Sequence, residues 1–231
     1  MNTEKMTLEP AETRSINPKV FTMWLFIVSI LMLFAAFTSA YLVRKAEGNW
    51  VEFKLPDLFS YSTVVLVLSS ISMHFALISA KKDQFNALRI SISITFVLGL
   101  LFLIMQFYGW IQLVEMNVFF VGNPSGSFVY VLSGLHGLHL VSGLIVLTFA
   151  LVAAFRFKIN AKSLTQIKIC TTYWHFLDAL WLYLFVFLLI AALNLKRLDI
   201  SENAIKNGFL FVPEHIMREL GLISDNTEFK N

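Results

Sequence analysis

Five polar side chains stand within otherwise apolar stretches of the sequence and are the residues best suited to chemistry. His136 and His139 lie three residues apart in Ser-Gly-Leu-His-Gly-Leu-His, His175 and Asp178 lie three apart in Tyr-Trp-His-Phe-Leu-Asp, and His74 stands alone upstream. Residues three apart on a helix share one face, so each pair presents two polar groups to the same neighbour. Such groups can bind a metal, transfer protons, or hydrogen-bond one helix to another.

Heme or copper ligation is the most demanding of these chemistries. Neutral imidazole is the commonest metal ligand, and two facing histidine-bearing helices can clamp a heme. A heme–copper centre needs more histidines than the four in these stretches, however, and there is no Cys-x-x-Cys-His motif. The single cysteine, Cys170, excludes a multi-cysteine metal site within this chain.

Motifs for nucleophilic, phosphate-binding and zinc-protease chemistry are absent as well. We therefore expect no catalytic residue, and no heme, metal or other cofactor bound by this chain itself. The five polar residues are interpreted as a cluster with a structural, lipid-related or proton-related role.

The composition indicates which elements carry these groups. The 231 residues are 57% hydrophobic and 14% charged, whereas soluble domains are about 45–50% hydrophobic and about 25% charged. The mean hydropathy is +0.71, so the chain has far more apolar surface than its own core needs. The formal charge of +3 is too small to indicate nucleic-acid binding. This composition is typical of a membrane protein.

Five apolar segments are long enough, at about 1.5 Å rise per residue, to cross a hydrocarbon core of about 30 Å. Asp178 is the only charged residue within them. Because they lack the alternation of barrel strands, the fold class is predicted to be all-α, a polytopic bundle of five transmembrane helices. The segments cover residues 20–43, 58–80, 90–114, 128–155 and 170–195.

Lys and Arg residues predict the orientation, because cytoplasmic loops are enriched in them. The N-terminal arm over residues 1–19 carries three, the second connection three and the fourth connection four, against three in the first connection and none in the third. The N-terminus is therefore predicted to be cytoplasmic and the C-terminus external. Residues 196–231 then form an external polar tail, in which Pro213 begins a short amphipathic helix that is either interfacial or a docking element.

Two long motifs resemble the signature pair of subunit III of the heme-copper terminal oxidases, the cytochrome c oxidase subunit III family. They are Ser-Gly-Leu-His-Gly-Leu-His-Leu-Val-Ser-Gly at residues 133–143 and Tyr-Trp-His-Phe-Leu-Asp-Ala-Leu-Trp-Leu at residues 173–182. The resemblance covers residues 20–195, and five helices match the short form of the family. Smaller upstream matches are Ser62, Thr63, Ser69, Ser70, Gln106 and Trp110.

The resemblance implies an accessory, non-redox subunit of a proton-pumping cytochrome c oxidase in a bacterial cytoplasmic (inner) membrane. Family members stabilise the catalytic subunit, bind phospholipid and support proton uptake during oxygen reduction. The implied partners are the heme-copper subunit I, subunit II, phospholipids and, through the external tail, a larger respiratory supercomplex. Heme and copper are expected in the partner subunits.

Two other classes of function are weighed beside this one. The first is the equivalent subunit of a quinol oxidase or a short homologue associated with nitric oxide reductase. The second is an autonomous heme- or metal-binding membrane enzyme.

Two carboxylates typical of the family are replaced in this chain. Ile30 occupies the position in the first segment where members usually have a carboxylate, and Gly109 occupies one in the third segment where they often have Glu. Asp178 is then the one carboxylate well inside the membrane, and it needs a hydrogen-bond partner. We expect that partner to be His175 or a histidine of the fourth segment, which favours a structural tie over a role in proton delivery.

Overall fold

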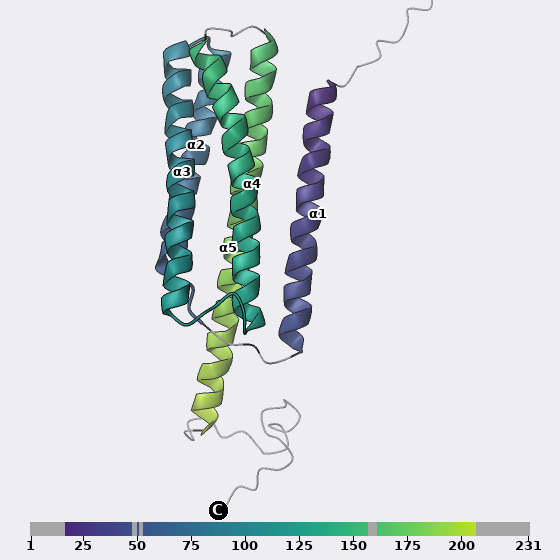
Figure 1. The fold of residues 1–231 in the computed structure, drawn as a ribbon, viewed down its shortest axis with the longest axis vertical. Helices are drawn as coiled ribbons and strands as arrows, with labels where there is room; N and C mark the ends of the chain where they lie inside the picture. Colours follow the sequence, from purple (N-terminus) through teal and green to yellow (C-terminus); the bar gives the residue numbers. More distant parts are fainter. Residues whose placement is uncertain (1–16, 48–49, 51–52, 157–160, 207–231) are drawn as a thin grey trace, which may run out of the picture.

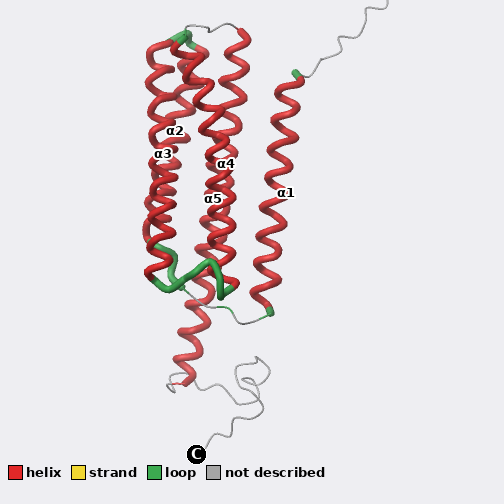
Figure 2. Tube along the Cα trace, viewed as in Figure 1, coloured by secondary structure: helices red, strands yellow, loops and turns green. Residues whose placement is uncertain are grey.

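The structure is a computed structural model that describes residues 17–47, 50, 53–156 and 161–206, with side chains in the last range described over 164–191. Every regular element in these ranges is a helix (Figures 1 and 2). All five are long and apolar enough to cross a membrane. The predicted all-α, five-helix, multi-pass fold is confirmed. The helices are α1 (Pro18–Ala46), α2 (Asp57–Lys81), α3 (Phe85–Glu115), α4 (Pro124–Phe155) and α5 (Ala161–Lys206).

The helices extend beyond the apolar segments from which they were predicted. The largest difference is in α5, which begins nine residues before residue 170 and continues eleven beyond residue 195. Apolar length marks only the part of a helix that lies in lipid, whereas polar residues continue the helix into the aqueous layers. The helix predicted to begin at Pro213 and most of the N-terminal arm lie outside the described residues.

Two helix starts are set by the same pair of residue types, an asparagine cap followed by proline. The Asn17 side chain accepts a hydrogen bond from the backbone N–H of Lys19, and Asn123 accepts one from that of Ser125. Proline suits the first helical position because its missing N–H would be unpaired there. Gly122 precedes the second cap at φ +119°, which favours glycine. Gly122, Asn123 and Pro124 therefore end the third connection and begin α4.

Helices α2, α3, α4 and α5 form a closed bundle in which each packs against two others (Figure 1). Helix α1 lies outside this bundle and packs against α4 and α5. It does so through one stripe with a spacing of three or four residues, as expected for a helix that buries a single face. The stripe consists of Met23, Ile27, Ile30, Phe34, Thr38 and Tyr41.

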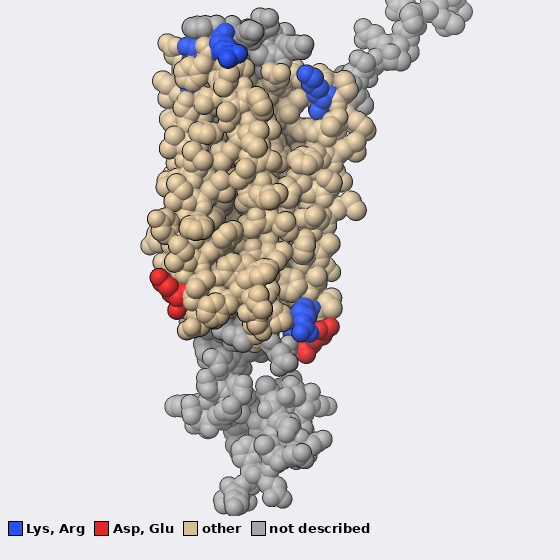
Figure 3. All heavy atoms as spheres, viewed as in Figure 1, with Lys and Arg blue, Asp and Glu red and all other residues tan. Residues whose placement is uncertain are grey.

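On the face drawn in Figure 3, the Lys, Arg, Asp and Glu side chains lie at the two ends of the bundle with an apolar band between them, whereas Asp178 is buried. Many large apolar side chains in this band are exposed on the outside of the helices. In each membrane-spanning window, between 17% and 44% of the residues are buried within the chain. The outward faces are therefore available to lipid or to other subunits.

Candidate functional site

Two tryptophans of α5 hydrogen-bond to hydroxyl groups of α2 in the interior of the bundle. Trp174 Nε1 donates to Ser69 Oγ at 3.1 Å, and Trp181 Nε1 donates to Thr63 Oγ1 at 3.0 Å. Both indoles are almost completely buried. Because no water is present in the hydrocarbon core to satisfy an indole N–H, these two bonds fix the register of α2 against α5.

The Trp174 ring packs against two glycines, one on α3 and one on α4. A Cβ atom on Gly99 of α3 would lie 2.7 Å from Trp174 Cη2. A Cβ atom on Gly143 of α4 would lie 2.8 Å from Leu177 Cδ1 and 3.6 Å from the Trp174 ring. The absence of a side chain at Gly99 lets the Trp174 ring reach α3 across the bundle, and the absence of one at Gly143 lets α4 pack against α5. The indole is thus enclosed by three helices.

His136 faces the interior of the bundle and is fully buried. Its ring lies 5.0 Å from Trp181 and 5.9 Å from Phe102, measured between centroids. Neither ring nitrogen has a hydrogen-bond partner among the described residues. The Gln106 side chain donates to Ser62 Oγ at 2.8 Å, while its Oε1 is buried without a partner. The interior of the bundle therefore contains unsatisfied polar atoms on both α3 and α4.

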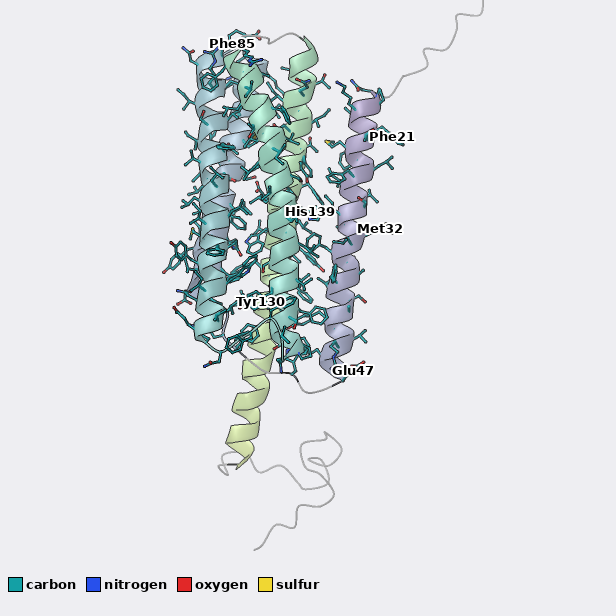
Figure 4. All side chains as sticks on the ribbon, viewed as in Figure 1. Phe21, Met32, Glu47, Phe85, Tyr130 and His139 are labelled. Atoms are coloured by element: carbon teal, nitrogen blue, oxygen red, sulfur yellow. The ribbon has the colours of Figure 1, made fainter. Side chains whose placement is uncertain are left out.

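His139 faces in another direction, toward α1 (Figure 4). Its ring meets Phe34 edge-on at 5.7 Å between centroids, and its Nδ1 hydrogen-bonds to the carbonyl of Leu135 in its own helix at 2.7 Å. The two histidines of the motif thus contact different helices although they are only three residues apart. A spacing of three rotates a helical side chain by about 60°, which is enough to move it to the next neighbour.

Asp178 lies near the middle of the span of α5 and is 4% exposed. Neither carboxyl oxygen has a hydrogen-bond partner of acceptable geometry, although the Ser70 hydroxyl of α2 lies close enough to act on it electrostatically. Ser70 Oγ shares a 2.7 Å hydrogen bond with His175 Nδ1. The His175 ring lies 6.1 Å from that of His74. The expected hydrogen bond from Asp178 to His175 or to a histidine of α4 is not present.

The structure therefore divides the predicted polar cluster into three parts. His175 and Asp178 lie where α5 packs against α2 and are connected through Ser70, and the exposed His74 lies beside His175. His136 lies inside the bundle, and His139 faces α1. Over the part of the chain that the structure describes, no three His, Cys, Asp or Glu side chains are grouped in a way that suits a metal ion.

Both positions that lack the family's carboxylate are packed with apolar groups. Ile30 is 3% exposed within the buried stripe of α1. At Gly109, a Cβ atom would lie 2.9 Å from Cε2 of Phe59, whose ring stacks on Trp181 at 6.1 Å. The Phe59 ring thus fills the volume that a side chain on residue 109 would need.

Restoring a carboxylate at Gly109 should therefore destabilise the chain. We expect Gly109→Glu to lower the free energy of unfolding by at least about 1–3 kcal/mol, the usual cost of overpacking a core. Phe59→Ala opens space beside residue 109, so the double variant should be less destabilised than the sum of the two single variants. Unfolding in detergent micelles measures all three, and strictly additive losses would contradict the packing explanation.

A cleft of about 920 Å³ opens between the last turns of α1 and the start of α4. Its walls include Ala36, Ala40, Pro124 and Phe128, and Arg44 lies at its end next to Glu47, with which it pairs. The cleft is thus mainly apolar. Its cationic group is Arg44, which lies at the same end of the bundle as Glu47, labelled in Figure 4.

The tryptophan–hydroxyl pairs and the cleft were not identified from the sequence as parts of a site. The pairs have a recognisable signal, because Trp174 and Trp181 are seven residues apart and the pairs Ser62-Thr63 and Ser69-Ser70 are also seven apart. Seven residues are two helical turns, so each set lies on one face. The cleft has no such signal, since it depends on how α1 leans against α4.

The sequence was compared with protein families and with characterised proteins. The model of the family described as cytochrome c oxidase subunit III matches residues 6–192, which reach from the N-terminal arm into α5. The probable cytochrome c oxidase subunit 3 of Nocardia farcinica is 34% identical over 163 residues, covering 68% of this chain and 80% of that protein.

Two further relatives differ from each other in their electron donors, according to their names. The cytochrome bo(3) ubiquinol oxidase subunit 3 of Buchnera aphidicola is 28% identical over 177 residues, covering 75% of this chain and 86% of that protein. The cytochrome c oxidase subunit 3 of Corynebacterium diphtheriae is 27% identical over 168 residues, covering 70% and 82%.

Proposed function

Because the chain belongs to the cytochrome c oxidase subunit III family, we propose that it is the accessory, non-redox subunit of a proton-pumping cytochrome c oxidase. In this role it packs beside the catalytic subunit I, which carries the hemes and copper, together with subunit II. It stabilises the catalytic subunit, holds phospholipid and supports proton uptake. The observation that carries the proposal is the family match over residues 6–192, which includes α1 to α4 and most of α5.

The membrane is the bacterial cytoplasmic membrane, with the N-terminus on the cytoplasmic side. The distribution of basic residues supports this orientation. Among the residues whose side chains are described, one end of the bundle carries Lys19, Lys81, Lys82, Arg89, Arg156 and Lys168. The opposite end carries Arg44, Lys45 and Lys54, accompanied there by the acidic residues Glu47, Asp57 and Glu115.

Phospholipid fits the cleft between α1 and α4. Its apolar walls match acyl chains, and the Arg44 guanidinium near the end of the bundle matches a phosphate headgroup. Ala36 and Ala40 have small side chains and are exposed along the cleft on this part of α1. A lipid there would fill the gap between α1 and the four-helix bundle.

Proton delivery is best served by Asp178. A carboxyl group with two unpartnered oxygens inside a membrane bundle is costly to keep, and ionisable groups at such depth commonly serve a function. Ser70 and His175 continue the row of polar groups from Asp178 toward the end of the bundle at which α5 begins. With Ile30 in the position of the family's carboxylate, Asp178 is the remaining acidic group for this task.

A quinol oxidase is the second candidate, and a specific observation favours keeping it. The relative from Buchnera aphidicola, named as a ubiquinol oxidase subunit, aligns with 75% of this chain, more than the Nocardia farcinica relative does. The electron donor binds elsewhere in such complexes, so this chain would have the same role in a cytochrome c oxidase and in a quinol oxidase. A short homologue associated with nitric oxide reductase belongs to this second candidate.

Purification of the native complex through a tag on this chain tests the proposal. We expect a heme-copper subunit I, a copper-containing subunit II and bound phospholipid to copurify with the chain. A complex oxidised by quinol and lacking a copper-containing subunit II would support the second candidate. Recovery of the chain alone, or with its own heme, would contradict both.

A further inference from the structure

We propose that the α2/α5 face around His74 and His175 is the docking surface for a transmembrane helix of a partner oxidase subunit, which supplies a hydrogen-bond acceptor to the His74 imidazole. This inference rests on the proposed function, because it requires the chain to work inside an oxidase complex. It concerns which face of the bundle meets the partner and by what chemistry.

His74 is an exposed histidine on a membrane-spanning helix. It lies seven residues before Lys81, the last residue of α2, which places its Cα about 10 Å from that end. Within the described part of the chain its only recorded partner is the ring of His175, at 6.1 Å between centroids. His175 itself is half-buried and uses Nδ1 to bond Ser70.

An imidazole carries at least one N–H donor in every protonation state found near neutral pH. In hydrocarbon this donor has no water to bond, so leaving it toward lipid costs free energy. Ionisable residues in transmembrane helices accordingly face a bundle interior, a water-filled cavity or a partner group. Among the described residues His74 faces none of these, which points to an acceptor on another subunit.

The other membrane histidines show how this chain otherwise accommodates imidazole. His139 bonds the carbonyl of Leu135, and His136 is enclosed between Trp181 and Phe102. His136 is fully buried, and His139 is half-buried against α1. His74 is the one described histidine that combines an exposed ring with no hydrogen bond.

The surroundings of His74 also suit a helix–helix contact. Ile71 and Phe75, which are 49% and 58% exposed, flank His74 on α2, so that apolar side chains surround the imidazole. A polar contact inside an apolar rim is how membrane helices achieve specific association. A helix docked there would bear on His74 directly and, through His175 and Ser70, on the carboxyl group of Asp178.

Site-specific photocrosslinking in the intact complex tests the location. Benzoylphenylalanine at position 74 should give a covalent adduct with another oxidase subunit. The same probe in place of Phe149 of α4, which is 72% exposed, serves as a matched outward-facing control and should give less subunit adduct. An intact complex in which position 74 yields only lipid adducts, or yields no more subunit adduct than position 149, would overturn the inference.

Substitution tests the chemistry. We expect His74→Leu to weaken retention of the chain in the complex by about 3- to 30-fold in a detergent titration, the range that corresponds to one interhelical hydrogen bond in a membrane. His74→Gln keeps a donor and should restore most of the retention. Tyr61→Leu, at a 65% exposed position elsewhere on α2, is the control. Equal retention for all of these variants would refute a polar contact at His74.

The two proposals fail in different ways. If the wild-type chain does not copurify with a heme-copper oxidase at all, the proposed function is wrong. If it copurifies but neither the crosslink nor the His74→Leu effect is seen, only the docking surface is wrong.

Discussion

Replacing Trp174 with alanine should lower the free energy of unfolding of this chain by about 3–5 kcal/mol, the usual loss when a large buried aromatic side chain is removed. The indole is 1% exposed, bonds Ser69 on α2, and packs beside Gly99 of α3 and Gly143 of α4. Its removal leaves a cavity among four helices and takes away the hydrogen bond that the Ser69 hydroxyl accepts. Unfolding of the purified chain in detergent micelles measures this loss.

Two matched variants separate the contributions of Trp174. Trp24→Ala removes a tryptophan that is 53% exposed on α1, and it should change the stability little. Trp174→Phe keeps most of the ring but not the donor, so it should cost about 0.5–1.5 kcal/mol beyond any packing loss. If Trp174→Ala is no worse than Trp24→Ala, Trp174 does not hold the bundle together.

Asp178→Asn should leave the stability of the chain unchanged but impair the oxidase. The carboxyl oxygens have no hydrogen-bond partner of good geometry, so no bond is lost on substitution. Asp178→Leu should even raise the free energy of unfolding, by up to about 1–3 kcal/mol, because it removes an unsatisfied buried polar group. An amide cannot exchange a proton at neutral pH, so sustained turnover or the pumped-proton yield should fall in the Asp178→Asn complex.

The complex must contain a full complement of this subunit for that comparison, and Thr148→Val is a suitable control. Thr148 is an exposed hydroxyl on α4 that bonds only the carbonyl of Leu144. Unchanged turnover and proton yield in Asp178→Asn would contradict a role in proton delivery. A large loss of stability in Asp178→Asn would instead support the structural role of Asp178 that was expected from the sequence.

The helices could be predicted from the sequence because membrane crossing depends on length and apolarity alone. The fourth segment was predicted from residue 128, whereas α4 begins at Pro124 after the Asn123 cap, because these first residues lie outside the apolar run. The length of α5 was predicted too short at both ends, because the residues that extend this helix out of the membrane are polar and do not continue the apolar run.

The candidate site was predictable only in part, because residue spacing gives the face of a helix but not its neighbour. His136 and His139 were correctly placed on one helix, yet packing directs one to Phe102 and the other to Phe34. His74 and His175 lie at similar depths in their two membrane-spanning segments, and the structure shows their rings in contact. The position of Phe59 against Gly109 required the three-dimensional packing of α2 on α3.

The initial oxygen-reduction rate of the oxidase purified from cells that lack this chain tests most directly whether the chain is an accessory subunit without a redox centre. We expect that complex to contain its full complement of heme and copper and to retain most of its initial rate, followed by faster loss of activity during sustained turnover. A missing heme or copper centre, or an initial rate abolished in an otherwise assembled complex, would contradict an accessory role.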